Sequence, residues 1–257
     1  MTRLDRTMTA VVCHGPRDYR VEKVGKPEAG PREIVVRVDA CGICAGDCKC
    51  WAGAPMFWGG DTPYVKPPVI PGHEFFGTVE TLGEGAGEHH GVAVGDRVIA
   101  EQIVPCERCR FCRSGQYWMC EVHNIFGFQR QVADGGIAEY MLYPATSRVH
   151  RIPAAMPLED AAIIEPLACA IHTVNRGDIQ LDDVVVIAGA GPLGLGMVAA
   201  AVAASAQQAG RVERVLEHRH WRGLPKGFRD LEGKPHARTQ RTIRSAESDL
   251  RWWNVGD

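Results

Sequence analysis

An apolar run that breaks into glycines limits the possible folds of this chain more than any other feature. Residues 184–194 read VVVIAGAGPLG, and an alanine-rich segment follows them. The pattern predicts a buried strand, a tight turn and a helix whose first N–H groups face a bound pyrophosphate. We therefore predict a dinucleotide site at the turn residues Gly189, Gly191, Pro192, Leu193 and Gly194.

Composition and charge are those of an ordinary globular protein. The chain has 257 residues, a net charge of −2 and 45% hydrophobic residues, so nucleic acid or an anionic membrane is not expected as its main partner. No stretch approaches the roughly 20 apolar residues of a membrane span, and we expect a cytoplasmic protein. In that compartment its ten cysteines favour metal ligation or catalysis over disulfides.

The first part of the chain alternates short β-rich runs with turn residues. The runs lie at residues 10–13, 19–24, 34–38, 75–82 and 97–101. Their spacing predicts an all-β, barrel-like domain with long loops over residues 1–157. From residue 158 the pattern becomes helical, so a linking helix and a partial nucleotide-binding domain are expected over residues 158–204.

Four cysteines lie within fifteen residues with the spacing C-x2-C-x2-C-x7-C; they are Cys106, Cys109, Cys112 and Cys120. Four thiolates so close together fit a tetrahedral structural zinc site, which would hold a lobe that lacks an apolar core of its own. An iron–sulfur cluster uses the same number of cysteines, and the spacing does not exclude it. A loop with four free thiols is the simpler alternative, which the regular spacing disfavours.

A second candidate metal site is dispersed along the chain, with Cys44, His73, Glu74 and Glu165 as its possible ligands. A catalytic zinc needs a few nitrogen, sulfur or oxygen ligands and one open position. Such a metal stabilises the alkoxide of a bound alcohol. Each residue alone has a simpler explanation, because a histidine in a turn and a glutamate that caps a helix are both common.

Together these motifs resemble the zinc-dependent medium-chain alcohol and polyol dehydrogenases. The resemblance covers roughly residues 8–204 and rests on five motifs, which are Cys41-Gly42-Ile43-Cys44, Gly72-His73-Glu74, the four-cysteine segment, Glu165-Pro166 and the glycine turn. Residues 13–22, 56–75 and 116–129 are most similar to the erythritol/L-threitol branch. The resemblance implies an α+β to α/β architecture, in which a GroES-like β-barrel precedes a Rossmann domain. It also implies NAD-linked oxidation of a small polyol to a ketose.

The resemblance also implies roles for individual residues. Cys44, His73 and Glu165 match ligands of a catalytic zinc, and Glu74 matches a residue that binds it directly or through water. Asp47 matches the carboxylate that orients the histidine ligand. The four-cysteine segment matches a second, structural zinc site, and the glycine turn matches the NAD site. Members of the family are commonly homo-oligomers.

Two positions depart from the family pattern. Gly46 stands where many members have a serine or threonine that relays the substrate proton, and Lys49 stands where a histidine is common. We therefore expect the proton path to run through water, Glu165, Glu74 or a neighbouring hydroxyl of the polyol.

Residues 205–257 differ in character from everything before them. They hold 16 apolar residues in 53 and a net charge of +4 (eleven basic minus seven acidic residues), whereas residues 1–204 carry −6. We predict no further buried strand of a parallel sheet here, and we do not count Glu213 as the ribose-binding acid. Three interpretations of this segment compete: a partner-binding extension, a disordered tail, and out-of-frame sequence that replaced the second half of a dehydrogenase. We favour the third.

The predicted activity is zinc-dependent, NAD-linked oxidation of a small polyol. The alternative is a non-catalytic zinc-binding remnant that binds no NAD. A quinone-reductase-like enzyme of the same superfamily is disfavoured, because those enzymes generally lack these zinc ligands. Apolar side chains of the strand and helix around the glycine turn would lack neighbours, so we expect the last third of the chain to be frayed.

Overall fold

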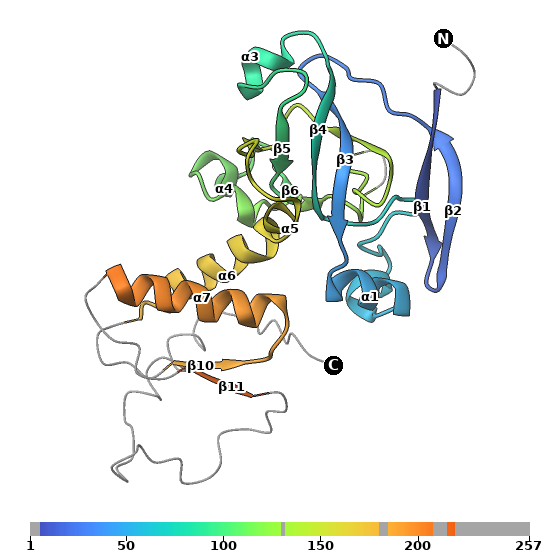
Figure 1. Ribbon diagram of the computed structural model, residues 1–257. Helices are drawn as coiled ribbons and strands as arrows, with labels where there is room; N and C mark the ends of the chain where they lie inside the picture. The colour runs from blue at the N-terminus through green and yellow to red at the C-terminus, as the bar shows by residue number, and fades with distance from the viewer. Residues whose placement is uncertain (1–5, 130–131, 180–184, 208–214, 219–257) are drawn as a thin grey trace, which may run out of the picture. The chain divides into compact units, whose positions relative to one another are not determined.

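Figure 1 shows a computed structural model of the chain. The structure describes residues 6–129, 132–179, 185–207 and 215–218. Most of the predicted tail, with Glu213, therefore lies outside the described residues. The chain divides into two compact units, Met1–Glu165 and Pro166–Asp257. The domain boundaries expected at residues 157 and 204 stay predictions.

A five-stranded antiparallel sheet forms the body of the first unit, with strand order β8-β3-β4-β5-β9. Figure 1 labels its three central strands, β3, β4 and β5. The strands are β3 (Ile34–Gly42), β4 (Glu74–Leu82), β5 (Arg97–Ala100), β8 (Tyr140–Tyr143) and β9 (Val149–Arg151). Ile34, Val36 and Val79 lie in one core with the ring of Phe75. Because β-branched and aromatic side chains pack well on a pleated surface, this core accounts for the strands in this part of the chain.

Two further ladders flank this sheet in the first unit, and the described sheets do not close into one continuous barrel. They pair β1 (Thr7–Gly15) with β2 (Asp18–Gly25), and β6 (Ile103–Val104) with β7 (Asn124–Ile125). Single bridges join β1 to other segments, from Ala10 to Ala138 and from Cys13 to Val69. Irregular register in β3, between Val35 and Val36 and between Val38 and Ala40, adds local bends to the main sheet.

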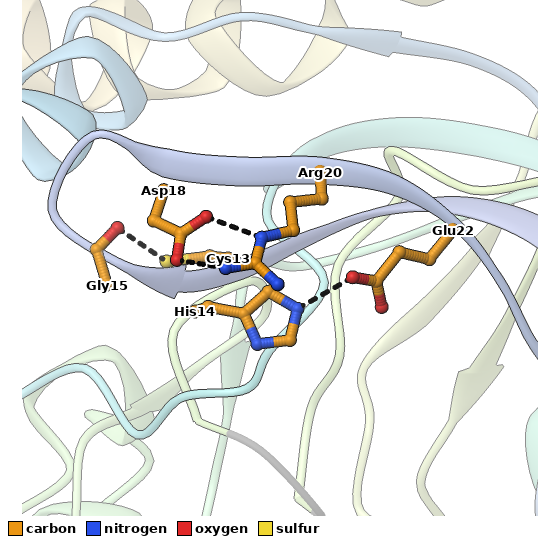
Figure 2. Close-up of polar contacts among 6 residues, drawn as sticks. All are labelled: Cys13, His14, Gly15, Asp18, Arg20 and Glu22. Atoms are coloured by element: carbon orange, nitrogen blue, oxygen red, sulfur yellow. Dashed lines mark hydrogen bonds and ion pairs between the residues drawn. The ribbon is translucent and has the colours of Figure 1, made fainter.

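The β1–β2 hairpin carries an exposed ion pair between Arg20 and Asp18 and a half-buried hydrogen bond between His14 and Glu22 (Figure 2). Arg20 donates two hydrogen bonds of 2.7 Å to Asp18, and His14 Nε2 lies 2.9 Å from Glu22 Oε1. Exposed pairs of this kind contribute little stability. The hairpin is therefore held mainly by its inner face, where the alternating residues Met8, Ala10 and Val12 are buried.

Short helices connect the strands of the first unit: α1 (Ala45–Ala52), α2 (Pro55–Trp58), α3 (Ala86–His90), α4 (Arg110–Arg113) and the 3₁₀ helix η2 (Tyr117–Met119). A further short helix, α5 (Leu158–Ala162), follows the last strand of that unit, β9. Helix α1 begins directly after β3, and Figure 1 shows it at the end of that strand. Its inner side chain, Cys50, packs in a cluster with Phe57, Val69 and Phe128. This cluster fixes the position of α1 beside the start of β4.

The second unit contains a small parallel pair and two helices. Helix α6 (Ile164–Arg176) leads into it, and strand β10 (Val185–Ala188), helix α7 (Pro192–Gln207) and strand β11 (Val215–His218) follow. The sequence predicted no further buried strand of a parallel sheet after residue 204, whereas β11 pairs in parallel with β10. A strand of four residues needs only a short backbone ladder, so a search for long apolar runs misses it. No helix among the described residues is long and apolar enough to cross a membrane.

Candidate metal centres

Cys44, His73 and Glu74 come together at the ends of two neighbouring strands. Their candidate ligand atoms all lie within 4.8 Å of one another. Cys44 follows the end of β3, and Glu74 begins β4 opposite Gly42 of β3. The antiparallel pairing of β3 and β4 therefore brings together residues that are about thirty positions apart in the sequence.

Cys44 also caps helix α1. Its Sγ accepts the N–H of Gly46 at 3.3 Å, and its own N–H donates to the Asp47 carboxylate at 2.9 Å. This reciprocal arrangement satisfies two backbone donors at the start of the helix. The same two bonds hold Cys44 Sγ at the N-terminus of α1.

Asp47 lies beside the ring of His73. Asp47 Oδ1 is 3.4 Å from His73 Nδ1, and both residues are buried. Burial by itself lowers the pKa of His73, but Asp47 and Cys44 outweigh burial and raise that pKa to about 10. A buried acidic group and a thiol thus provide a strongly cation-binding environment around one imidazole.

The donor set fits zinc. A thiolate, an imidazole and a carboxylate are all zinc ligands, and three protein ligands leave a position for substrate. Neither Asp47 Oδ1 nor His73 Nδ1 has a hydrogen-bond partner among the described residues. A carboxylate beside the second nitrogen of a ligating histidine is the usual support of such a metal site.

Glu165 is not part of this group. It is the last residue of the first unit and lies in the first turn of α6, and it is not among the residues whose ligand atoms come within 4.8 Å of one another. Its role as a further zinc ligand therefore stays a prediction.

The four-cysteine segment forms the second candidate metal centre. The Sγ atoms of Cys106, Cys109, Cys112 and Cys120 all lie within 4.8 Å of one another. Backbone N–H groups point at the sulfur atoms, from Cys112 to Cys109 at 3.5 Å and from Cys106 to Cys120 at 3.4 Å. Backbone N–H donors from Cys112 and Glu121 lower the pKa of Cys109 to about 6. Desolvation and the neighbouring thiols instead raise the pKa of Cys112 to about 12, so Cys109 is favoured over Cys112 as a thiolate in the metal-free segment.

Little apolar packing supports the lobe around these cysteines. Its large apolar side chains Trp118, Met119 and Val122 are all exposed. A polar network joins the lobe to the sheet. In this network the Tyr117 hydroxyl donates to the Glu101 carboxylate at 2.9 Å, and His150 contacts the same carboxylate at 3.0 Å. A four-thiolate metal would therefore supply much of the order that apolar burial does not.

The glycine turn in the second unit has the geometry that the sequence predicted. Gly189 adopts a φ of +108°, which favours glycine. A Cβ on Gly194 would overlap the carbonyl of Gly189, so only glycine fits there. Pro192 and Leu193 begin α7, and Leu195 donates to Gly191 at 3.0 Å. The turn leads directly into a helix N-terminus, as a pyrophosphate site requires.

Comparison with known proteins identifies the first unit. The alcohol dehydrogenase GroES-like domain matches residues 30–154. This part of the chain belongs to that family. The prediction of a GroES-like fold followed by the first strand, turn and helix of a Rossmann domain is confirmed.

The relatives are alcohol and polyol dehydrogenases. The erythritol/L-threitol dehydrogenase of Mycolicibacterium smegmatis is 51% identical over 200 residues, which are 77% of this chain and 55% of the relative. An alcohol dehydrogenase from Escherichia coli CFT073, solved with NADH, has a TM-score of 0.67 and 29% identity over 82% of this chain and 56% of its own. A cobalt- and zinc-bound alcohol dehydrogenase from Pyrobaculum aerophilum has a TM-score of 0.65 and 29% identity, and the match covers 82% of this chain and 59% of that protein. The chain spans about half the length of the curated relatives that it matches.

Proposed function

We propose that this chain carries the catalytic zinc site of a polyol dehydrogenase. With NAD, the enzyme oxidises a secondary hydroxyl of a small, erythritol- or L-threitol-like polyol to a ketose. The observation that supports this proposal most is the group of Cys44, His73 and Glu74 with Asp47 behind the imidazole. The 51% identity to an erythritol/L-threitol dehydrogenase supports the substrate class.

Each residue of the group has a distinct task in this proposal. Cys44 and His73 hold the catalytic zinc together with Glu165 in the complete site, and Glu74 binds the metal directly or through water. The bound metal would lower the pKa of a coordinated hydroxyl, as zinc does for water. Asp47 keeps the imidazole oriented and balances its charge. The glycine turn binds the NAD pyrophosphate, and the four-cysteine lobe holds a structural zinc.

Position 46 is a glycine, so no side-chain hydroxyl at this position can accept the proton of the substrate hydroxyl. An added Cβ on Gly46 would have only Cys44 Sγ, at 3.6 Å, and His73 Cε1, at 3.9 Å, within 4 Å. Water or the neighbouring hydroxyl of the polyol therefore has access to this side of the group, and the carboxylates Glu74 and Glu165 are further acceptors. Proton inventories of kcat in mixed H2O and D2O, compared between the wild type and Gly46→Ser, test this route.

A non-catalytic zinc-binding protein is the second candidate. The described residues of the second unit provide only two parallel strands, β10 and β11, whereas a Rossmann domain binds dinucleotides across a larger sheet. In this case both metal centres are retained but NAD is not bound. We also propose a cytoplasmic location and, when a dehydrogenase assembles, a homo-oligomer.

Metal analysis and nucleotide titration together test the proposal. We expect two zinc ions in the wild type, one in Cys44→Ser and two in the control Cys48→Ser, which changes an exposed thiol on the same helix. Micromolar NADH binding and NAD-dependent oxidation of erythritol or L-threitol would support the enzyme. Two zinc ions without NADH binding would support the non-catalytic protein. Retention of both zinc ions in Cys44→Ser would refute the catalytic zinc site itself.

A further inference from the structure

The ring of Phe128 lies against the ring of His73. Their centroids are 5.5 Å apart and their planes are inclined by 35°. Both side chains are buried, with exposed fractions of 4% and 7%. Phe128 is therefore an apolar residue in direct contact with one member of the candidate catalytic group.

Hydrogen bonds do not fix the His73 ring by themselves. Asp47 Oδ1 lies 3.4 Å from His73 Nδ1, but neither atom makes a hydrogen bond to a described residue. A contact of this length and poor alignment constrains ring orientation weakly. A metal-binding imidazole needs a defined ring plane, so packing has to supply part of that constraint.

Phe128 is well placed to supply it, because its own ring is held on several sides. It stacks on Phe57 with a centroid distance of 5.2 Å and an angle of 9°, and it packs against Tyr64 at 5.9 Å. Its carbonyl accepts the N–H of Lys66 at 2.9 Å. The Tyr64 hydroxyl donates to the carbonyl of His123 at 2.9 Å, which fixes Tyr64 in turn.

We propose that Phe128 is a positioning residue of the metal centre. Its ring fixes the plane of the His73 imidazole, so that a ring nitrogen stays within 4.8 Å of Cys44 Sγ and a Glu74 oxygen. The proposal rests on the proposed metal site at these three residues. It assigns Phe128 no contact with substrate or cofactor.

Phe57 provides a matched control. It belongs to the same buried aromatic cluster and stacks on Phe128, yet its ring has no recorded contact with the His73 ring among the described residues. Phe57→Leu and Phe128→Leu should therefore destabilise the cluster to a similar extent, whereas only Phe128→Leu should affect the metal centre. If Phe128→Leu does not fold, Phe128→Met keeps more apolar volume while removing the flat ring.

The first readout is cobalt substitution of the full chain. Difference spectra against Cys44→Ser isolate the thiolate-to-cobalt and d–d bands of this centre from those of the four-cysteine lobe. We expect Phe128→Leu to shift these bands and to weaken cobalt binding by about 10- to 100-fold, as for other residues that support metal ligands. Phe57→Leu should give the wild-type spectrum and affinity.

The second readout needs no metal. Relaxation of ¹³C-labelled histidine in the metal-free chain should show a more mobile His73 ring in Phe128→Leu but not in Phe57→Leu. If cobalt binds and the two variants behave alike in both readouts, the positioning role is refuted while the metal site stands. If no cobalt signal depends on Cys44 but Phe128→Leu still mobilises His73, the metal site is refuted, and with it the role of Phe128 at a metal centre, while the packing of Phe128 on the His73 ring is confirmed.

Discussion

Asp47 gives the sharpest test of the metal centre, because one buried carboxylate has two separable contacts. Its Oδ2 accepts the N–H of Cys44 at 2.9 Å, and its Oδ1 lies 3.4 Å from His73 Nδ1. Asp47→Asn keeps an oxygen that can cap helix α1 but removes the negative charge beside the imidazole. Asp47→Ala removes both contacts.

The expected magnitudes follow from these contacts. Loss of a helix cap costs about 0.5–2 kcal/mol, and an unpaired buried polar group costs about 1–3 kcal/mol. Metal-free Asp47→Ala should therefore be less stable by about 2–4 kcal/mol, and Asp47→Asn by less. Loss of the carboxylate that supports a ligating histidine weakens metal binding about 10- to 100-fold, and we expect this in both variants.

The pH dependence of the metal-free protein adds a further check. Because the pKa of His73 is raised to about 10, its contribution to stability is complete below its unfolded pKa of about 6.5. That contribution is lost as the pH rises through about 10. Asp47→Asn should remove most of this loss between pH 7 and 10.

Urea unfolding in the presence of a chelator measures the stability, and competition with a chromophoric chelator measures zinc affinity. Asp39→Asn is a suitable control, because Asp39 is an acid of β3 that accepts a hydrogen bond from Thr78 at 2.8 Å. It should leave zinc affinity unchanged. Wild-type zinc affinity in Asp47→Asn would refute the inference that this carboxylate supports the metal site.

Five further substitutions test other parts of the chain. Cys109→Ser should remove one zinc ion and expose the four-cysteine lobe to proteases, and full zinc retention would contradict the second centre. Gly46→Ala should stabilise α1 by about 0.5–1 kcal/mol in thermal unfolding without zinc loss, since its Cβ would meet its nearest neighbours at 3.6 and 3.9 Å. Burial lowers the pKa of His90, so the contribution of His90 to folding stability is complete above about pH 6.5 and falls as the pH drops. His90→Asn should therefore reduce the change in urea stability between pH 7 and 5. An unchanged pH profile of stability would count against this. Gly194→Ala should lower the melting temperature and abolish NADH binding, because its Cβ would overlap the Gly189 carbonyl. Gly191→Ala, with no protein atom within 4 Å, should weaken NADH binding but leave the melting temperature unchanged; an equal loss of melting temperature in both variants would contradict the turn geometry.

The strands that the sequence predicted are those with a clear local signal. The runs at 34–38 and 75–82 lie within β3 and β4 because β-branched residues recur there on a buried face. Strand β8, with the sequence YMLY, was not predicted. Its position depends on pairing with β3, as in the contact of Tyr143 with Ile34, and a partner more than a hundred residues away leaves no local pattern.

The site was predictable in its chemistry but not in its support. Metal-binding residue types in recognisable motifs identified Cys44, His73 and Glu74, and the β3–β4 pairing brings them together. The contact of Phe128 with His73 joins residues 55 positions apart. An isolated phenylalanine has no motif, so only the folded arrangement reveals it.

Cys44 links the metal centre to local folding, because the same side chain caps α1 and belongs to the ligand group. Zinc binding should therefore stabilise the start of α1 as well as the metal centre. Cys44→Ser separates the two roles, since serine is a strong N-cap but a poor zinc ligand. If zinc protects the backbone N–H groups of α1 from exchange in the wild type but not in Cys44→Ser, the metal rather than the cap determines the order of this helix. Equal protection in both proteins would assign that order to the cap alone.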